Sequence, residues 1–189
     1  AKDKALESNM AGIVVIGGDG SFRGAADLSK AGIPCVGIPG TIDNDIQCTE
    51  FTIGYDTAMN TVMEMVDKLR DTSHSHERCA VVEVMGRRAG FIAVNVALAV
   101  GAEAALTLER PYDLDKIAAK MIRTRDSKGK SHFIIVVSEG VGNVENIART
   151  IQEMTGIESR ATVLGHVQRG GSPTVRDRIA ATELGYHAV

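Results

Sequence analysis

Short apolar runs alternate with longer amphipathic stretches along the chain, and this pattern predicts strands followed by helices. The apolar runs are rich in valine and isoleucine, which is typical of parallel strands buried on both faces. We predict strands at residues 12–16, 33–38, 78–85, 104–108, 132–138 and 160–164. We predict helices at residues 21–30, 55–70, 89–100, 114–125, 143–154 and 176–189. The regular alternation favours the α/β class, with mostly parallel sheets flanked by helices.

The helical periodicity is clearest in residues 55–70. Apolar side chains recur there at three- and four-residue spacing and would form one buried face; they are Ala58, Val62, Met65, Val66 and Leu69. No internal repeat or linker-rich stretch marks a domain boundary. A division near Thr52 would separate the first strands and helices from the rest.

Composition narrows the classes of function. Hydrophobic residues make up 44% of the 189 residues, enough for a packed core. The formal net charge of -3 gives no general attraction to nucleic acid or to an anionic membrane, and no apolar run is long enough to span a bilayer. The cysteines Cys35, Cys48 and Cys79 have no metal-binding spacing and fit a reducing compartment, so we expect the cytoplasm.

Four segments rich in glycine or polar residues follow predicted strands, and we call them corners. The first corner is residues 17–21, GGDGS, between a predicted strand and a predicted helix. In open parallel sheets, ligands bind beyond the carboxyl ends of the strands. Glycines let backbone N–H groups approach a phosphate, and a helix N-terminus attracts it. Asp19 suits Mg²⁺, which takes carboxylate, water and phosphate ligands. A tight turn with Asp19 near the helix cap is the alternative interpretation.

The second corner is residues 41–45, TIDND, directly after a Pro-Gly turn. Asp43 and Asp45 are one residue apart, so in an extended segment they would face the same side. Two carboxylates that close require a cation, hydrogen bonds or water. One of them is suited to take a proton while the other supports metal or substrate, and Thr41 offers a hydroxyl to a phosphate. A cluster of Asx turns is the alternative.

The third corner is residues 84–90, VMGRRAG, which contains two arginines. We expect Arg87 and Arg88 to open a helix, where cations oppose the helix dipole. That unfavourable placement points to a bound anion, and an ordinary surface pair of arginines is the alternative.

The fourth corner is residues 164–173, which hold His166, Gln168 and Arg169 among glycines after a strand. These side chains suit a sugar phosphate, because arginine forks onto phosphate oxygens; a structural histidine is the alternative. Glu139 adds a carboxylate after another strand. Together, the four corners hold the parts of a phosphoryl transferase that acts on a phosphorylated metabolite.

Four motifs in these corners closely resemble the 6-phosphofructokinase family, in particular its bacterial ATP-dependent type. They are GGDGS at residues 17–21, PGTIDND at 39–45, MGR at 85–87 and GHVQRGG at 165–171, and the resemblance covers nearly the whole chain. It implies two Rossmann-like lobes, with residues 1–52 in the nucleotide-binding lobe and residues 53–189, including the linking helix, mainly in the sugar-phosphate-binding lobe. It also implies a reaction of glycolysis, in which MgATP and fructose 6-phosphate give fructose 1,6-bisphosphate and ADP.

The resemblance implies roles for individual residues. Asp43 would take the proton from the sugar 1-hydroxyl, Thr41 would lie against the transferring phosphoryl group, and Arg87 would offset its charge. Asp19 would hold Mg²⁺. The ATP phosphates would be lined by Gly18, Gly20, Ser21 and Gly24. The sugar phosphate would be bound by Thr41, Asp43, Asp45, Arg78, Met85, Gly86, Arg87, Glu139, Arg160, His166 and Arg169.

The resemblance also implies assembly and regulation. Arg78 and Arg160 would bind the 6-phosphate in a neighbouring subunit's site, within a homotetramer. An effector, ADP or phosphoenolpyruvate, would bind at the positions that match the family's allosteric site, which are Arg70, Gly101, Glu103, Lys128 and Lys130. Ser131 departs from this pattern, because the family often has a further basic residue there.

Two glycines indicate the phosphoryl donor. Pyrophosphate-dependent relatives usually carry an aspartate where Gly20 stands and a lysine where Gly40 stands, and such side chains would fill the space that the α-phosphate of a nucleotide needs. Glycine at both positions therefore favours ATP. The sequence leaves three alternatives open: a pyrophosphate-dependent enzyme, a lipid or NAD kinase, and a catalytically silent subunit that binds sugar phosphates.

Two parts of the family pattern do not occur in this chain. They are the first strand with its glycine loop and following arginine, and the C-terminal portion; the chain also has no start methionine. Without the first strand, the sheet of the nucleotide-binding lobe would have an unpaired edge. We therefore expect this segment by itself to have little or no activity, and its function to be that of the parent enzyme.

Overall fold

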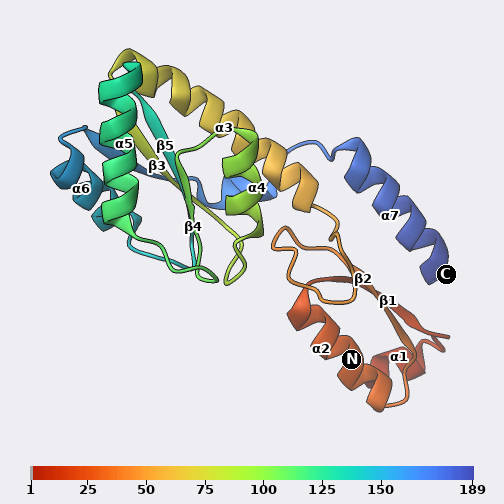
Figure 1. The fold of residues 1–189 in the computed structure, drawn as a ribbon. Helices are drawn as coiled ribbons and strands as arrows, with labels where there is room; N and C mark the ends of the chain where they lie inside the picture. The colour runs from red at the N-terminus through yellow and green to blue at the C-terminus, as the bar shows by residue number, and fades with distance from the viewer. Residues whose placement is uncertain (1) are drawn as a thin grey trace. The chain divides into compact units, whose positions relative to one another are not determined.

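The computed structural model describes residues 2–189 as alternating helices and strands (Figure 1). Their order is α1 (Lys2–Glu7), β1 (Ile13–Gly17), α2 (Asp19–Lys30), β2 (Cys35–Pro39), α3 (Tyr55–Ser75), β3 (Cys79–Val84), α4 (Phe91–Ala99), β4 (Ala104–Leu106), α5 (Leu114–Lys128), β5 (Phe133–Ser138), α6 (Val144–Thr155), β6 (Ser159–Val163), the 3₁₀ helix η1 (Gly165–Arg169) and α7 (Val175–Ala188). Each pairing between these strands is parallel. The predicted α/β class with parallel sheets flanked by helices is confirmed.

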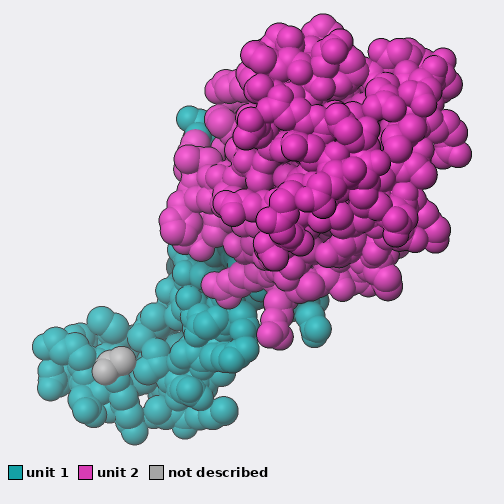
Figure 2. Space-filling view, turned by 90° about the vertical axis from the view of Figure 1, so that its left-hand side faces the viewer, with its two compact units in different colours: residues 1–57, 172–189 teal, residues 58–171 magenta. Residues whose placement is uncertain are grey.

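The chain forms two compact units, which Figure 2 shows in different colours. Unit 1 comprises residues 1–57 and 172–189, and unit 2 comprises residues 58–171. The sequence predicts one boundary near residue 52, with residues 53–189 mainly in the second lobe. The structure instead returns α7 to unit 1, because Asp177 accepts hydrogen bonds from Gly54 and Thr57.

Unit 1 is built on a two-stranded parallel sheet of β1 and β2. The Phe22 ring of α2 packs over this sheet at Gly37, where a Cβ atom would lie 2.9 Å from the ring. Val14, Ile16 and Val36 are exposed on the sheet. The first strand is therefore parallel, as predicted, but alternate residues along it are exposed, because α2 packs on one of its faces.

Unit 2 is built on a four-stranded parallel sheet with the strand order β4-β5-β3-β6. Because the strands are parallel, all four begin at one edge of the sheet and end at the other. We call the first the amino edge, where the strands start at Cys79, Ala104, Phe133 and Ser159. We call the second the carboxyl edge, where they end at Val84, Leu106, Ser138 and Val163.

The core of unit 2 lies on the faces of this sheet. Alternate residues of β3 and β5, such as Val81 and Ile135, pack with α5 and α6 in a cluster of fully buried side chains. Helix α4 contacts β4 and β5, and its Ile92 and Val96 are buried. Because helices cover the central strands, their sequences are continuous apolar runs.

The structure contains every predicted strand and helix, with small shifts at their ends. The largest difference is α3, which continues five residues beyond the predicted end to Ser75. Asp113 caps α5 as predicted, since its Oδ1 accepts the amide of Lys116 at 3.1 Å. Within residues 2–189, no helix combines the length and apolar character needed to cross a bilayer.

Candidate active site

The first corner of unit 1 is the turn between β1 and α2. Helix α2 begins at Asp19, and its N-cap residue Gly18 supplies no side-chain hydrogen bond. The first N–H groups of the helix therefore lack a capping side chain, and an anion is favoured at this end. A Cβ atom at Gly20 or Gly24 would meet no atom within 4 Å, so open space lies beside both glycines. This corner has the local geometry of a phosphate cradle.

The second corner packs directly against the first. A Cβ atom at Gly18 would lie 3.5 Å from Cβ of Thr41, and the amide of Gly40 donates to the carbonyl of Gly17 at 3.0 Å. The parallel register causes this contact, because it pairs Gly17 with Pro39 and so ends both strands at the same edge. The structure therefore brings the two predicted corners of unit 1 together.

Hydrogen bonds fix the loop that carries Asp43. Oγ1 of Thr41 accepts the amide of Asp43 at 3.2 Å, and the Thr52 hydroxyl donates to the carbonyl of Thr41 at 2.6 Å. The side-chain oxygen of Asn44 accepts the amide of Thr52 at 2.9 Å. Asp43 itself is buried, with 5% of its surface exposed. The loop thus holds this carboxylate in place through contacts of its own residues.

The prediction that Asp43 and Asp45 face the same side is wrong. Residues 41–45 do not form an extended segment, because Asn44 adopts a left-handed backbone conformation with φ of 52°. Asp43 is buried, whereas Asp45 is exposed. The two carboxylates therefore have different surroundings, and Asp43 is the one enclosed by protein.

Asp19 is the predicted Mg²⁺ ligand. Its side chain is 48% exposed, and its Oδ2 lies 2.5 Å from Nη2 of Arg23, one turn along α2. Within residues 2–189, no group of three or more His, Cys, Asp or Glu side chains gathers as a metal site. Mg²⁺ commonly binds through one or two carboxylates together with water and phosphate. Asp19 offers one half-exposed carboxylate, and phosphate oxygens at the helix N-terminus would supply further ligands and offset the positive end of the helix dipole, so this residue fits that ion.

In unit 2, Glu139 organises the third corner at the carboxyl edge. Its Oε1 accepts the amide of Gly86 at 3.0 Å and also the amide of Arg87. Gly86 has φ of 136°, a conformation that glycine adopts without a steric penalty. This backbone turn presents both amides to one carboxylate oxygen. Glu139 therefore holds the loop that contains the predicted residues Met85, Gly86 and Arg87.

Gln168 links the third corner to the fourth. Its Oε1 accepts the amide of Met85 at 3.1 Å, its Nε2 donates to the carbonyl of Gly165 at 2.9 Å, and the residue is 1% exposed. A cavity of about 80 Å³ lies here, lined by Glu83, Val84, Met85, Glu139, Val163, Gly165 and His166. Burial and the neighbouring Glu139 carboxylate raise the pKa of Glu83. The structure thus brings Met85, Glu139 and His166 to one place.

The prediction that Arg87 and Arg88 open a helix is wrong. Both arginines are exposed in a turn, and α4 starts only at Phe91 with Gly90 as its N-cap. The charged group at the start of α4 is acidic, because Oε1 of Glu109 accepts the amide of Gly90 at 2.6 Å. An unfavourable helix dipole therefore gives no reason to expect an anion at Arg87, and its candidate role follows from its place at the carboxyl edge.

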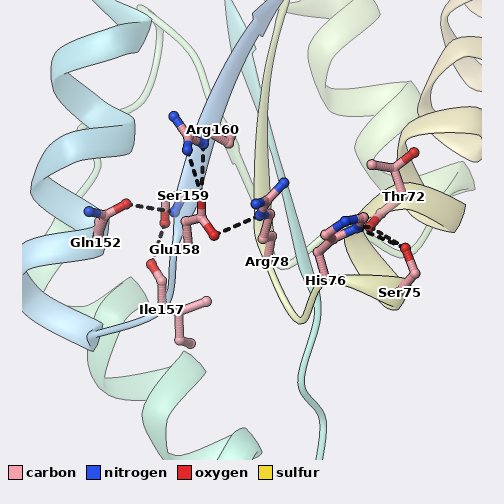
Figure 3. A network of polar contacts seen from close by, with 9 residues as sticks. All are labelled: Thr72, Ser75, His76, Arg78, Gln152, Ile157, Glu158, Ser159 and Arg160. Atoms are coloured by element: carbon pink, nitrogen blue, oxygen red, sulfur yellow. Dashed lines mark hydrogen bonds and ion pairs between the residues drawn. The ribbon is translucent and has the colours of Figure 1, made fainter.

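Arg78 and Arg160 lie at the opposite, amino edge of the sheet, where both bind Glu158 (Figure 3). Nε of Arg78 lies 2.7 Å from Oε2 of Glu158, and Nε and Nη2 of Arg160 lie 2.9 Å and 2.6 Å from Oε1. The length of β3 separates Arg78 from Met85, and at roughly 3.3 Å per residue this amounts to about 20 Å. The two arginines are therefore too far away to bind a sugar phosphate held at the carboxyl edge of the same unit.

The predicted effector residues in unit 2 are Arg70, Gly101, Glu103, Lys128 and Lys130. Glu103, just before β4, is 5% exposed at its side chain and lies 2.9 Å from Nζ of Lys120 and 3.3 Å from Nζ of Lys130. Burial acts to raise the pKa of Glu103, but the two ammonium groups outweigh it and the pKa is lowered. Arg70 donates to the carbonyl of Val100, directly before Gly101. These contacts bring Arg70 next to Gly101 and Lys130 next to Glu103 near the amino edge, and none of them involves Lys128.

The predicted site residues are divided between the two units. Gly18, Asp19, Gly20, Ser21, Gly24, Thr41, Asp43 and Asp45 belong to unit 1. Arg78, Met85, Gly86, Arg87, Glu139, Arg160, His166 and Arg169 belong to unit 2. Within unit 2, His166 and Arg169 are exposed on η1.

Three organising residues were missed by reasoning from the sequence: Asn44, Glu158 and Asp177. Asn44 and Asp177 bind partners elsewhere in the chain, and no local pattern marks those partners. Glu158 had one available signal, because it precedes Arg160 by two residues and so shares its face of an extended segment.

The fold and these corners define a class of protein. Parallel sheets present an uncapped, glycine-rich helix N-terminus beside a buried carboxylate, and polar corners follow the ends of further strands, as in α/β proteins that bind phosphorylated metabolites. The family model described as Phosphofructokinase matches residues 1–189. The chain therefore belongs to the phosphofructokinase family.

Individual relatives agree with this assignment. The ATP-dependent 6-phosphofructokinase of Lysinibacillus sphaericus is 59% identical over 178 residues, which cover 94% of this chain and 56% of the relative. The enzyme of the same name from Bacillus cytotoxicus is 54% identical over 192 residues, which cover 100% of this chain and 60% of the relative. The chain thus spans 56–60% of the length of these two curated relatives.

Solved structures share the fold. The phosphofructokinase from Saccharomyces cerevisiae matches with a TM-score of 0.91 at 33% identity, over 100% of this chain and 30% of that one. The Pichia pastoris phosphofructokinase in the T-state matches with a TM-score of 0.93 at 30% identity, over 99% of this chain and 22% of that one. A pyrophosphate-dependent phosphofructokinase from Marinobacter aquaeolei, at 22% identity and a TM-score of 0.84, covers 99% of this chain and 53% of that one and shows the same fold.

Proposed function

We propose that the protein containing this chain transfers a phosphoryl group from MgATP to the 1-hydroxyl of fructose 6-phosphate. The products are fructose 1,6-bisphosphate and ADP, and the reaction belongs to glycolysis in the cytoplasm. The names of the bacterial relatives support this reaction, and three unpaired cysteines support a reducing compartment. One observation carries the proposal: the loop of the buried Asp43 packs against the uncapped N-terminus of α2.

In this reaction, Asp43 is the base that takes the proton of the 1-hydroxyl as its oxygen attacks the γ-phosphate. The contacts of Thr41, Asn44 and Thr52 hold its loop, so the carboxylate is positioned before the substrate arrives. The amides at the start of α2 bind phosphate oxygens. Mg²⁺, when bound, neutralises charge on the phosphates, and Asp19 is the residue that would hold it.

Unit 2 supplies the groups for the sugar phosphate and the transferring phosphoryl group. Arg87 would offset the charge that develops on the phosphoryl group. By family resemblance, the residues of unit 2 assigned to the sugar phosphate are Met85, Gly86, Glu139, His166 and Arg169. The residues of unit 1 with this assignment are Thr41, Asp43 and Asp45. The cavity of about 80 Å³ at the carboxyl edge is lined in part by Met85, Glu139 and His166, and it supports a binding role for these three residues.

The protein works as a homo-oligomer, by family resemblance a tetramer. Arg78 and Arg160 then bind the 6-phosphate in a neighbouring subunit's site. The separation of about 20 Å between these arginines and the carboxyl edge supports a contribution to another subunit. The cluster around Glu103, with Arg70 and Lys130, would bind the effector, ADP or phosphoenolpyruvate.

The open space beside Gly20 supports ATP as the donor, because the aspartate of pyrophosphate-dependent relatives would occupy that space. Gly40 gives weaker support for ATP as the donor. A Cβ atom there would lie 3.0 Å from Cγ2 of Ile16, so packing inside unit 1 by itself favours glycine at this position. The choice of donor therefore depends mainly on Gly20.

The test is steady-state phosphoryl transfer by the full-length protein, with fructose 6-phosphate and either MgATP or pyrophosphate. Asp43→Asn should lower turnover by roughly 10²–10⁴ with MgATP, as expected for the loss of a general base. Asp27→Asn, an exposed aspartate on α2 paired with Lys30, is the matched control and should keep full activity. Transfer from pyrophosphate only would contradict the assigned donor. Binding of the sugar phosphate without any transfer would favour a silent binding subunit.

A further inference from the structure

Glu158 connects the two arginines that the proposed function assigns to the 6-phosphate. We propose that Glu158 is a positioning residue that holds Arg78 and Arg160 as one paired phosphate-binding unit. This inference rests on the proposed function, because it concerns the same two arginines.

The register of the sheet creates the arrangement. β3 pairs with β6 so that Cys79 lies opposite Ser159, and the amide of Cys79 donates to the carbonyl of Glu158 at 2.8 Å. Arg78 therefore lies across from Glu158. Glu158 and Arg160 are two residues apart in an extended segment and project from the same face. A shift of one residue in the pairing would separate the three side chains.

The carboxylate divides its two oxygens between the arginines (Figure 3). Oε2 accepts from Nε of Arg78, and Oε1 accepts from Nε and Nη2 of Arg160. Within residues 2–189, these contacts leave Nη1 of both arginines and Nη2 of Arg78 without a protein acceptor. Guanidinium groups bind phosphate through such paired terminal nitrogens. Glu158 therefore holds the inner side of each guanidinium and leaves the outer side for an anion.

The charges support the same role. Two guanidinium groups held side by side repel each other, and a carboxylate between them removes this repulsion while the trio keeps a net charge of about +1. The hydrogen bonds and charges of Arg78 and Arg160 lower the pKa of Glu158, so the carboxylate stays ionised at neutral pH. Arg160 is 70% exposed at its side chain. Without its carboxylate partner, such a long exposed side chain would sample many rotamers, and ordering it would weaken binding.

The backbone that carries Glu158 is anchored by other groups. Oε1 of Gln152 accepts the amide of Ser159 at 3.0 Å, and the Ser159 hydroxyl donates to the carbonyl of Ile157 at 3.0 Å (Figure 3). Neither contact uses the Glu158 side chain. A change of this side chain should therefore release the arginines and leave the start of β6 in place.

The test uses the full-length protein and measures kcat and KM for fructose 6-phosphate and for ATP. In Glu158→Gln one oxygen becomes an amide donor that opposes an arginine N–H, so one arginine loses its partner. We expect KM for fructose 6-phosphate to rise about tenfold, the effect of losing one charge-assisted hydrogen bond. We expect kcat and KM for ATP to change less than about twofold. Glu153→Gln, an exposed glutamate on α6, is the matched control and should leave every constant unchanged.

The variants Arg78→Ala and Arg160→Ala distinguish a failure of this inference from a failure of the proposed function. Both should raise KM for fructose 6-phosphate, and Glu158→Gln should raise it by a smaller factor in the Arg160→Ala background than in the wild type, since one of the two partners of Glu158 is already gone. If the arginine variants raise KM and Glu158→Gln leaves it unchanged or lowers it, the positioning role is overturned and the proposed function stands. If the arginine variants leave KM unchanged, their assignment to the 6-phosphate fails, and the positioning role fails with it. An equal rise of KM for both substrates with a lower melting temperature would show a merely structural role and would also overturn the inference.

Discussion

Replacing Asp177 by alanine should destabilise unit 1, because this carboxylate holds the start of α3. Asp177 lies in the first turn of α7 and is 2% exposed. Its Oδ1 accepts the amide of Gly54 at 2.9 Å, and its Oδ2 accepts the amide of Thr57 at 2.9 Å and the Thr57 hydroxyl. It therefore caps the N-terminus of α3 from a position 120 residues later in the chain.

The size of the loss in the free energy of unfolding depends on which groups lose their hydrogen-bond partner. Asp177→Ala removes the acceptor of two partly buried amides at the N-terminus of α3, and each lost hydrogen bond to the charged carboxylate costs about 1.5–3 kcal/mol. The Thr57 hydroxyl keeps one contact, because it accepts the amide of Thr174 at 3.1 Å. We therefore expect a loss of about 3 kcal/mol in the free energy of unfolding. For a chain of this size, that lowers the melting temperature by roughly 6–12 °C.

The assay combines thermal unfolding, followed by circular dichroism, with native-state hydrogen exchange at the amides of Gly54 and Thr57. Both amides should exchange faster in Asp177→Ala. Glu183→Gln changes an exposed carboxylate on the same helix and should leave the melting temperature unchanged. A fall in melting temperature of less than about 2 °C, with unchanged exchange at both amides, would refute the role of Asp177 as a cap.

Two further predictions concern unit 2. Burial raises the pKa of the Cys79 thiol to about 12. Iodoacetamide at pH 8 should therefore label the exposed Cys48 and spare Cys79 in the native protein, which mass spectrometry can show. Rapid labelling of Cys79 would contradict this prediction. The folded-state pKa of Glu103 is lowered from 4.5, so its contribution to stability is present above pH 4.5 and lost as the pH falls through the folded-state pKa. Glu103→Gln should therefore lower the free energy of unfolding, measured in urea at pH 7, by about 2 kcal/mol, and the difference from wild type should shrink below pH 4.5. A difference in stability that is independent of pH would contradict this prediction.

Features set by neighbouring residues could be predicted from the sequence. The apolar spacing in residues 55–70 predicted α3, and Asp113 was identified as the cap of α5, which its contact with Lys116 confirms. The glycine-rich corner before α2 and the TIDND motif were identified as two of the four corners that together hold the parts of a phosphoryl transferase. These signals depend on contacts within a turn or two of the chain, so the residues themselves contain the information.

Side-chain environments could not be predicted in the same way. Asp43 and Asp45 look equivalent in the sequence, yet one is buried and the other exposed, because Asn44 adopts a left-handed conformation that its bonds with Thr52 stabilise. The start of α4 was placed two residues early, because its acidic partner Glu109 comes from beyond the next strand. In both cases the deciding hydrogen bond joins segments that are separated in the chain.

The sequence by itself determined the alternation of strands and helices, the class of fold and the polar corners at strand ends. Tertiary structure alone decided which corners meet. The strand order β4-β5-β3-β6 and its register place Arg78 with Glu158 at one edge and Met85 with Glu139 at the other. Strand pairing depends on many weak contacts summed over the whole sheet, and neither strand alone specifies its neighbour. The pairing of Arg78 with Glu158 is therefore a property of the folded sheet, although both residues were visible in the sequence.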